Sequence, residues 1–89
     1  MVDSGTFNRL SKEERSEYLS HRPGFIEAVL NKSYAGDGSD FAEKYKLQNS
    51  NGLWYLVGPE DNKPFAGIQS KCKAVIEALF TDAVQNYGR

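Results

Sequence analysis

The stretch from Ser70 to Tyr87 constrains the fold of this chain more than any other part of the sequence. Its apolar residues recur at alternating steps of three and one, the spacing of a single apolar stripe along an α-helix. Ser70 is suited to cap the start of this helix, and Gly88 to stop it. The stripe comprises Cys72, Val75, Ile76, Leu79, Phe80, Ala83, Val84 and Tyr87. A helix of this length is marginal alone in water, so other segments must cover the stripe.

Polar residues occupy the remainder of the same stretch. They are Lys71, Lys73, Glu77, Asp82 and Gln85. None of them falls on the stripe, which predicts one apolar and one polar side for this helix.

The length and the cysteine content of the chain bound its class. Its 89 residues are enough for one domain, and the single cysteine, Cys72, rules out an internal disulfide and suits a reducing compartment. No apolar run approaches the roughly 20 residues that a membrane span needs. The N-terminus lacks the basic and apolar regions of a signal peptide. We therefore expect a soluble, cytoplasmic protein without a membrane partner.

Charge is nearly balanced overall but unevenly placed. The formal net charge is −1, with five basic against eight acidic residues in 1–43 and six basic against four acidic residues in 44–89. Most nucleic-acid-binding domains are more basic than this. The charge distribution is therefore only a weak indication of such a partner.

The N-terminal part of the chain predicts a flexible end followed by two helices. Residues 1–10 are polar and small, with few apolar anchors, so we expect them to be flexible. Ser11 and Glu14 form a capping-box pattern, which predicts a helix from there to about Leu19. Pro23 disfavours helical geometry at the residue before it, so a second helix should begin there and run to about Tyr34. Its core-facing residues are expected to be Phe25, Ile26, Val29 and Leu30.

The second half of the chain predicts a three-stranded antiparallel meander. Residues 44–48 alternate like a strand, although a helix over 40–47 is the alternative. Asn51-Gly52 is a strong hairpin signal, and 53–57 is the next strand. Residues 65–68 are expected to form the third strand. Together, these helix and strand patterns predict an α+β fold. Residues 11–89 form a single domain in it, and the C-terminal amphipathic helix packs on the sheet.

No set of residues forms a catalytic or metal-binding motif. Cys72 and His21 are the only thiol and the only imidazole, and Cys72 lies on the core stripe. A structural zinc site requires four ligands, and one cysteine with one histidine does not provide them. Neither of the two common glycine-rich phosphate-binding patterns is present. The carboxylates are scattered over polar segments. We therefore expect a protein that is not an enzyme and that holds no cofactor and no metal.

The residues with the most binding potential are aromatic side chains on the predicted sheet together with nearby lysines. Aromatic rings can stack on bases while lysines neutralise phosphates. The candidate binding residues are Trp54, Tyr55, Lys44, Lys46, Lys63, Lys71 and Lys73. The alternative is that Trp54 belongs to the core and that the lysines are simply solvated.

The layout of these residues is loosely similar to a known DNA-binding module. Asn51-Gly52-x-Trp54-Tyr55, Lys63-x-Phe65 and a capped helix resemble the three-strand-plus-helix arm-binding modules of phage-type integrases. The similarity covers 44–80 and implies that the sheet would enter a DNA groove. It departs from those modules at 53–57, which carries no charge where their strands are basic.

The strand at 53–57 also motivates the principal functional hypothesis. It is apolar on both faces, and the C-terminal helix can cover only one of them. The other face needs the N-terminal helices or a partner. We therefore expect a small non-enzymatic regulatory protein that binds another protein, with self-association as a homodimer as one form. A nucleic-acid-binding regulator that uses the sheet lysines is the alternative.

Overall fold

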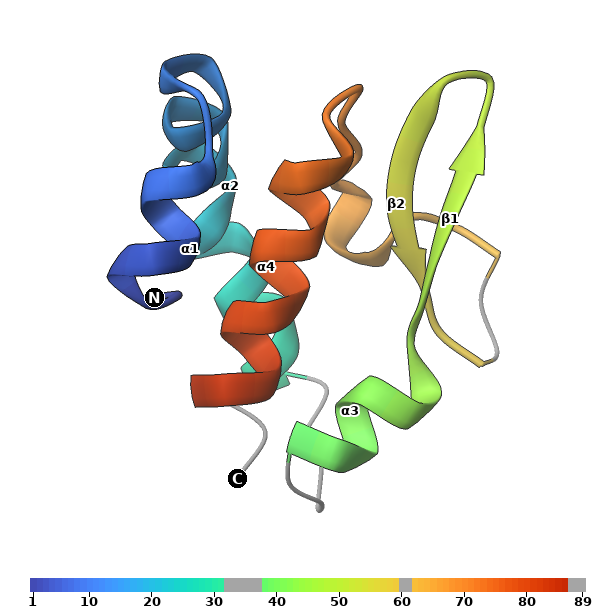
Figure 1. Ribbon diagram of the computed structural model, residues 1–89. Coiled ribbons are helices and arrows are strands. Elements are labelled where there is room, and N and C mark those ends of the chain that lie inside the picture. Colours follow the sequence, from blue (N-terminus) through green and yellow to red (C-terminus); the bar gives the residue numbers. More distant parts are fainter. Residues whose placement is uncertain (32–37, 60–61, 87–89) are drawn as a thin grey trace.

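The computed structural model describes residues 1–31, 38–59 and 62–86. It confirms an α+β fold in which the C-terminal helix packs against a small antiparallel sheet. Figure 1 shows α4 in the middle, with α1 and α2 on one side of it and the β-hairpin on the other. The elements are α1 (Ser4–Arg9), α2 (Lys12–Asn31), α3 (Gly38–Lys44), β1 (Lys46–Ser50), β2 (Leu53–Val57), the 3₁₀ turn η1 (Phe65–Gly67) and α4 (Lys73–Asn86).

The predicted break at Pro23 is wrong, because α2 runs through this residue as one helix of 20 residues. The capping box at its start is confirmed: the Glu14 N–H donates to Ser11 Oγ (3.1 Å), and the Ser11 N–H donates to Glu14 Oε1 (2.7 Å). Pro23 has no N–H for the carbonyl of Leu19, one turn earlier. Both residues are exposed, so the helix places this missing hydrogen bond on its solvent side.

Residues 1–10, which were expected to be flexible, contain α1. Asp3 caps this helix by accepting a hydrogen bond from the Thr6 N–H (2.8 Å). Val2 and Leu10 flank it and are both buried in the core. These two apolar residues anchor the segment, a contribution that its polar composition does not reveal.

The hairpin of β1 and β2 follows the sequence closely. Asn51 and Gly52 have φ angles of 54° and 82°, the left-handed geometry that a two-residue hairpin turn with Asn-Gly adopts. Residues 44 and 45 do not join β1, because α3 extends to Lys44. Both the predicted strand and its helical alternative are therefore realised in part, one after the other.

The predicted third strand is wrong, and the sheet has two strands. Residues 65–67 form η1 instead, because Ala66 and Gly67 have φ angles of 58° and 70° and so cannot be extended. An isolated bridge adds to β2, in which the Trp54 N–H donates to the Ser70 carbonyl (2.7 Å) and the Ser70 N–H donates to the Trp54 carbonyl (3.0 Å). The three-strand layout that resembled the integrase modules is thus not formed.

The amphipathic helix is confirmed as α4, although it begins at Lys73 and not at Ser70. Ser70 lies in the bridge to β2, and its hydroxyl accepts a hydrogen bond from the Cys72 N–H (2.9 Å). Four stripe residues are buried and three are partly buried. Tyr87, the predicted stop at Gly88 and the predicted end of the second helix at Tyr34 lie outside the described residues. The buried four are Val75, Ile76, Leu79 and Ala83, and the partly buried three are Cys72, Phe80 and Val84.

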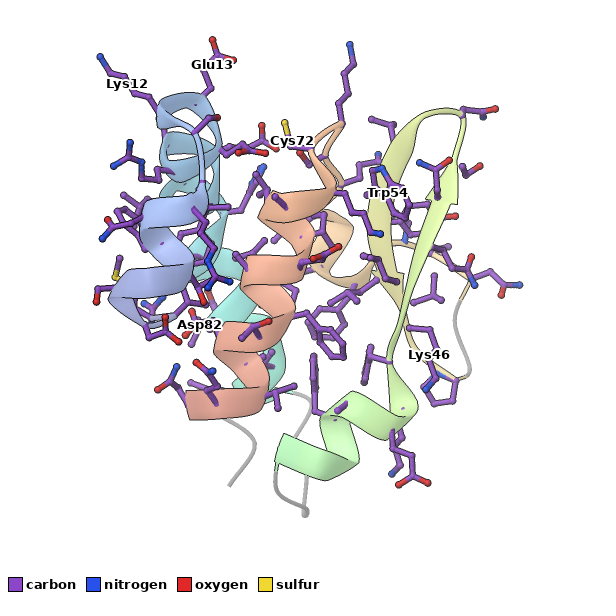
Figure 2. The ribbon with its side chains drawn as sticks, in the orientation of Figure 1. Lys12, Glu13, Lys46, Trp54, Cys72 and Asp82 are labelled. Carbon is purple, nitrogen blue, oxygen red and sulfur yellow. The ribbon has the colours of Figure 1, made fainter. Side chains whose placement is uncertain are left out.

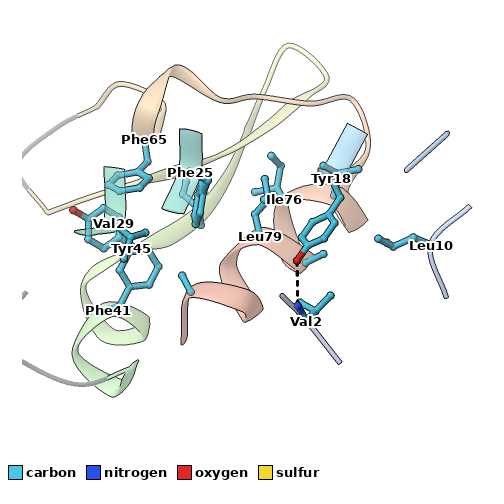
Figure 3. Packing of buried hydrophobic residues seen from close by; sticks show 14 residues of the cluster. Val2, Leu10, Tyr18, Phe25, Val29, Phe41, Tyr45, Phe65, Ile76 and Leu79 are labelled. Carbon is cyan, nitrogen blue, oxygen red and sulfur yellow. Dashed lines mark hydrogen bonds between the residues drawn. The ribbon is translucent and has the colours of Figure 1, made fainter. Parts of the chain in front are cut away.

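A cluster of aromatic rings fills the space between α2, α3, η1 and α4 (Figure 3). The rings of Phe41 and Tyr45 stack at 4.6 Å between centroids, and Tyr45 meets Phe65 edge-on at 5.0 Å. Phe25 from α2 lies edge-on to Phe65 at 5.3 Å. Offset and edge-on arrangements at these distances are the favourable geometries for ring pairs. We call these four rings the aromatic cluster.

Candidate functional site

The structure places the two predicted aromatic residues, Trp54 and Tyr55, on opposite faces of the hairpin. Trp54 lies opposite Asn49 in the register, and Tyr55 lies opposite Gln48. Successive strand residues point to opposite faces. Trp54 is partly buried against the core, on the face that α4 covers, so Tyr55 belongs to the other face.

Lys73 contacts an aromatic member of the predicted set. Lys73 Nζ lies 4.9 Å from the centroid of the Trp54 ring, a cation–π distance, and 3.5 Å from Glu77 Oε1. Lys71 is exposed two residues before it. Trp54, Lys71 and Lys73 therefore gather where α4 begins beside β2.

The other predicted residues lie elsewhere. Lys46 pairs with Val57 at the far end of the hairpin from the turn, and Figure 2 places it well below Trp54. Lys44 ends α3, and Lys63 lies between β2 and η1. The binding residues predicted from the sequence therefore lie on at least two separate surfaces and do not form a single site.

A buried ionic cluster around Asp82 was not anticipated, because Asp82 was assigned to the polar side of the helix. Its side chain is 0% exposed. The cluster comprises Asp82, Tyr18, Arg22, Asn86 and the α-amino group of Met1, and we call it the Asp82 cluster. Asp82 lies three residues after the stripe residue Leu79, but its position in the helix does not reveal that Tyr18 and Arg22 reach it from α2.

Each carboxylate oxygen of Asp82 accepts two short contacts. Oδ2 accepts from Arg22 Nε (2.7 Å) and from the Tyr18 hydroxyl (3.0 Å). Oδ1 accepts from the amide nitrogen of Asn86 (2.8 Å) and lies 2.7 Å from the α-amino nitrogen of Met1. The carboxylate therefore ties α2, α4 and the N-terminal segment together.

The pKa values in this cluster follow from burial and hydrogen bonding. Burial by itself raises the pKa of Asp82, but the bonds from the α-amino group, Arg22 and Tyr18 outweigh it and leave that pKa below 3.8. Burial also raises the pKa of Tyr18 above 10.0, and the adjacent Asp82 carboxylate adds to this effect. The two groups are thus held as a carboxylate and a neutral phenol, a fully bonded pair with a structural role.

The exposed apolar surface lies on α2, not on the hairpin. Leu19 is 46% exposed and Leu30 is 59% exposed, whereas Leu30 had been expected to face the core. Pro23 is also exposed, and Ile26 is half-buried. Their spacing of four, three and four residues places all four along one side of the helix. We call Leu19, Pro23, Ile26 and Leu30 the α2 stripe.

The apolar character of β2 is largely accounted for by burial within the chain. Leu56 and Val57 are buried, and Leu53, Trp54 and Tyr55 are half-buried. The described residues of the strand therefore do not offer the open second face that the sequence suggested. The α2 stripe takes its place as the candidate interaction surface.

Two kinds of site do not occur within the ranges 1–31, 38–59 and 62–86. No three of their His, Cys, Asp and Glu side chains are grouped so that they could hold a metal ion. No helix there combines the length and the apolar character needed to span a bilayer.

Comparison with known proteins adds no family. No protein-family model, no curated protein and no solved structure matches this chain.

Proposed function

We propose that this chain is a small non-enzymatic interaction protein that binds another protein through the α2 stripe. The observation that carries the proposal is the exposure of Leu19 and Leu30 on one side of a helix that otherwise packs into the core. Of the three large hydrophobic residues that are exposed in the described part of the chain, these are the two on α2. Apolar surface that gathers on one face is a mark of protein contact sites.

The energetics of burial favour a partner at this surface. Fully burying an exposed leucine side chain is worth roughly 1.5–3 kcal/mol, so covering Leu19 and Leu30, which are 46% and 59% exposed, contributes about half of this value for each residue. The four residues of the α2 stripe suit helix-in-groove or helix-on-helix recognition, in which anchors recur every three or four residues.

The surroundings of the stripe also suit a contact surface. Ser16, Ser20 and Glu27 are exposed and lie along one flank of the stripe, as helical spacing from Leu19 places them. An apolar centre with a polar rim is the usual anatomy of a protein interface. The rim provides hydrogen-bonding groups without placing a charge within the stripe itself.

Site-directed photo-crosslinking tests this proposal. A photoreactive residue replaces Leu19 in one variant and Gln85, an exposed residue of α4, in a control. We expect protein adducts from position 19 that the control does not form, and mass spectrometry identifies the partner. Binding of the purified partner should then fail for Leu30→Glu. Adducts of equal yield from both positions would contradict the proposal.

A second candidate function rests on the contact between Lys73 and Trp54. With Lys71 beside them, these residues offer a ring and two cations to a nucleic acid. A DNA titration followed by Trp54 fluorescence at two salt concentrations tests it. We expect tighter binding at low salt and weaker binding for Lys71→Gln. Binding that is undetectable at low salt would remove this candidate.

We also propose a cytoplasmic location. Cys72 is a free, half-buried thiol, which suits a reducing compartment. A fluorescent fusion followed by fractionation tests the location, and recovery in an oxidising compartment would contradict it.

A further inference from the structure

We propose that the Asp82 cluster is a recognition site for a free α-ammonium group, so that a modification which removes the charge of the Met1 α-amino group releases the N-terminal segment. The site is occupied by the first two residues of this chain. The inference is independent of the proposed function, because the α2 stripe contains none of the residues that form the site.

The charge of the ammonium group meets a carboxylate that is closed off from water. The α-amino nitrogen of Met1 lies 2.7 Å from Asp82 Oδ1, and the Asp82 side chain is 0% exposed. A hydrogen bond between two ions is shorter and stronger than one between neutral groups. An acetylated nitrogen keeps one N–H but carries no charge, so it loses the ionic part of this contact.

The site also contacts the backbone that follows the ammonium group. Asn86 Nδ2 donates to the Met1 carbonyl (3.1 Å), and the Val2 N–H donates to the Tyr18 hydroxyl (3.1 Å), as Figure 3 shows for Val2. The ammonium group, the first carbonyl and the second N–H therefore each have a partner. Capture of a terminal amine is a recurring mode of peptide recognition.

The side chains of the first two residues lie in different surroundings. Met1 is 48% exposed, whereas Val2 is 5% exposed and belongs to the core. The first side chain is therefore not what the site recognises. The site binds the amino group of the first residue, and it places the apolar side chain of the second residue in the core.

The helix that follows depends on its flanking residues for attachment. α1 contains no buried residue of its own. Val2 and Leu10 lie on either side of it and are both buried, and the Phe7 ring meets Tyr18 edge-on at 6.2 Å between centroids. Losing the ionic contact at Met1 therefore weakens the attachment at one end of this helix.

The rest of the fold should survive the loss of this contact. Arg22 Nε donates to Asp82 Oδ2 (2.7 Å), so the carboxylate keeps a cationic partner when the ammonium group is gone. Breaking a buried ion pair is most costly when it leaves one ion alone. The carboxylate is not left alone here, and we therefore expect the release to be confined to the N-terminal segment.

Chemical synthesis of the full chain, with ligation at Cys72, provides the test. It gives three forms that differ only at the Met1 nitrogen, namely a free amine, an Nα-methyl amine and an Nα-acetyl amide. Methylation keeps the charge, whereas acetylation removes it. In the acetyl form we expect the backbone amides of residues 2–10 to exchange with solvent about tenfold faster or more, the effect of one lost hydrogen bond to a charged group. The methyl form should exchange like the free amine.

Two further measurements identify the cause of faster exchange. The NMR shifts of Phe41 and Phe65 in the aromatic cluster should be the same in all three forms, which shows that the core stays folded. In an Asp82→Asn background, acetylation should accelerate the exchange of residues 2–10 by a much smaller factor, because the partner of the charge is already absent.

Each outcome supports or overturns the proposal. Equal exchange in the free and acetyl forms overturns it. A methyl form that exchanges as fast as the acetyl form also overturns it, because the size of the group and not its charge would then be responsible. An equal effect of acetylation with and without Asp82 overturns it as well. If Asp82→Asn does not fold, the comparison of the methyl and acetyl forms of the wild type decides.

Discussion

Two regions of opposite chemistry hold α4 in place. The aromatic cluster packs apolar rings from α2, α3 and η1 on one side of the core, whereas the Asp82 cluster binds α2 and the N-terminal segment through charges on the other. Figure 3 places Ile76 and Leu79 between the rings and Tyr18. One helix thus meets its neighbours by non-directional burial and by directional bonds.

The difference between the two regions teaches what each can contribute. Ring burial stabilises the fold in proportion to the area removed from water and tolerates small shifts. Buried ions lose hydration, so their net contribution is smaller, but their bonds fix how the segments are oriented. We infer that the aromatic cluster provides most of the stability and that the Asp82 cluster fixes the position of the N-terminal segment.

The largest effect should come from a charge placed in the part of the core that lies between the two regions. Ile76→Asp places an unpaired carboxylate at a side chain that is fully buried, and we expect this variant not to fold. Circular dichroism and thermal melting measure the loss. Lys73→Asp is the control, because this exposed position near the helix start should cost less than about 1 kcal/mol. Similar melting curves for the two variants would mean that the core side of α4 is misassigned.

The next effect should come from the aromatic cluster alone. Phe41→Ala removes a fully buried ring that stacks on Tyr45 and should lower the free energy of unfolding by about 3–5 kcal/mol. Urea unfolding measures this change. Phe41→Leu keeps much of the volume and should lose less. An alanine variant as stable as the leucine variant would show that the rings are not tightly packed.

A smaller loss should follow from breaking the Asp82 cluster. Asp82→Asn removes the charge that Arg22 and the α-amino group face, and we expect a loss of about 3 kcal/mol. This is the low end for buried pairs, because the α-amino group and Arg22 keep access to water. Urea unfolding measures this loss. In a separate hydrogen-exchange experiment, the N-terminal amides of Asp82→Asn should exchange faster than those of Phe41→Leu. Unchanged exchange at residues 2–10 would contradict the orienting role.

The smallest effect should be a loss of stability at low pH that depends on the Asp82 cluster. The pKa of Asp82 is lower in the folded chain than its ordinary value, so its contribution is complete above about pH 4 and is lost as the pH falls through the folded pKa. Urea unfolding at about pH 6 and pH 3 should therefore show a larger loss for the wild type than for Asp82→Asn. Equal losses in both chains would place the acid sensitivity elsewhere.

Local patterns predicted the elements whose geometry is set by near neighbours in the chain. Ser11 and Glu14 satisfy each other's backbone groups, so the capping box is legible in four residues. Asn51-Gly52 adopts the turn that its dipeptide favours, and β2 has the predicted bounds. These signals act between residues that are close in the chain. Bringing such residues together costs little chain entropy and needs no tertiary contact.

Patterns failed where distant contacts override a local preference. Pro23 is tolerated within α2 because the helix packs against α4 on its other side, and Leu30 faces outward although its spacing resembles that of core residues. Ala66 has a left-handed φ next to Phe65, which packs in the aromatic cluster, and a 3₁₀ turn stands where the strand was expected. Among the candidate site residues, Trp54, Lys71 and Lys73 lie together where α4 begins.

Hydrophobic period and turn chemistry are local properties, so they already specify an amphipathic α4, a hairpin before it and an α+β chain. The packing of segments that are distant in the chain places Asp82 inside and the α2 stripe outside. Both outcomes depend on which neighbours reach a given side of a helix. Arg22, 60 residues away in the chain, is what makes a buried carboxylate tolerable. The segments that pack around α2 decide which of its two apolar sides stays in contact with water.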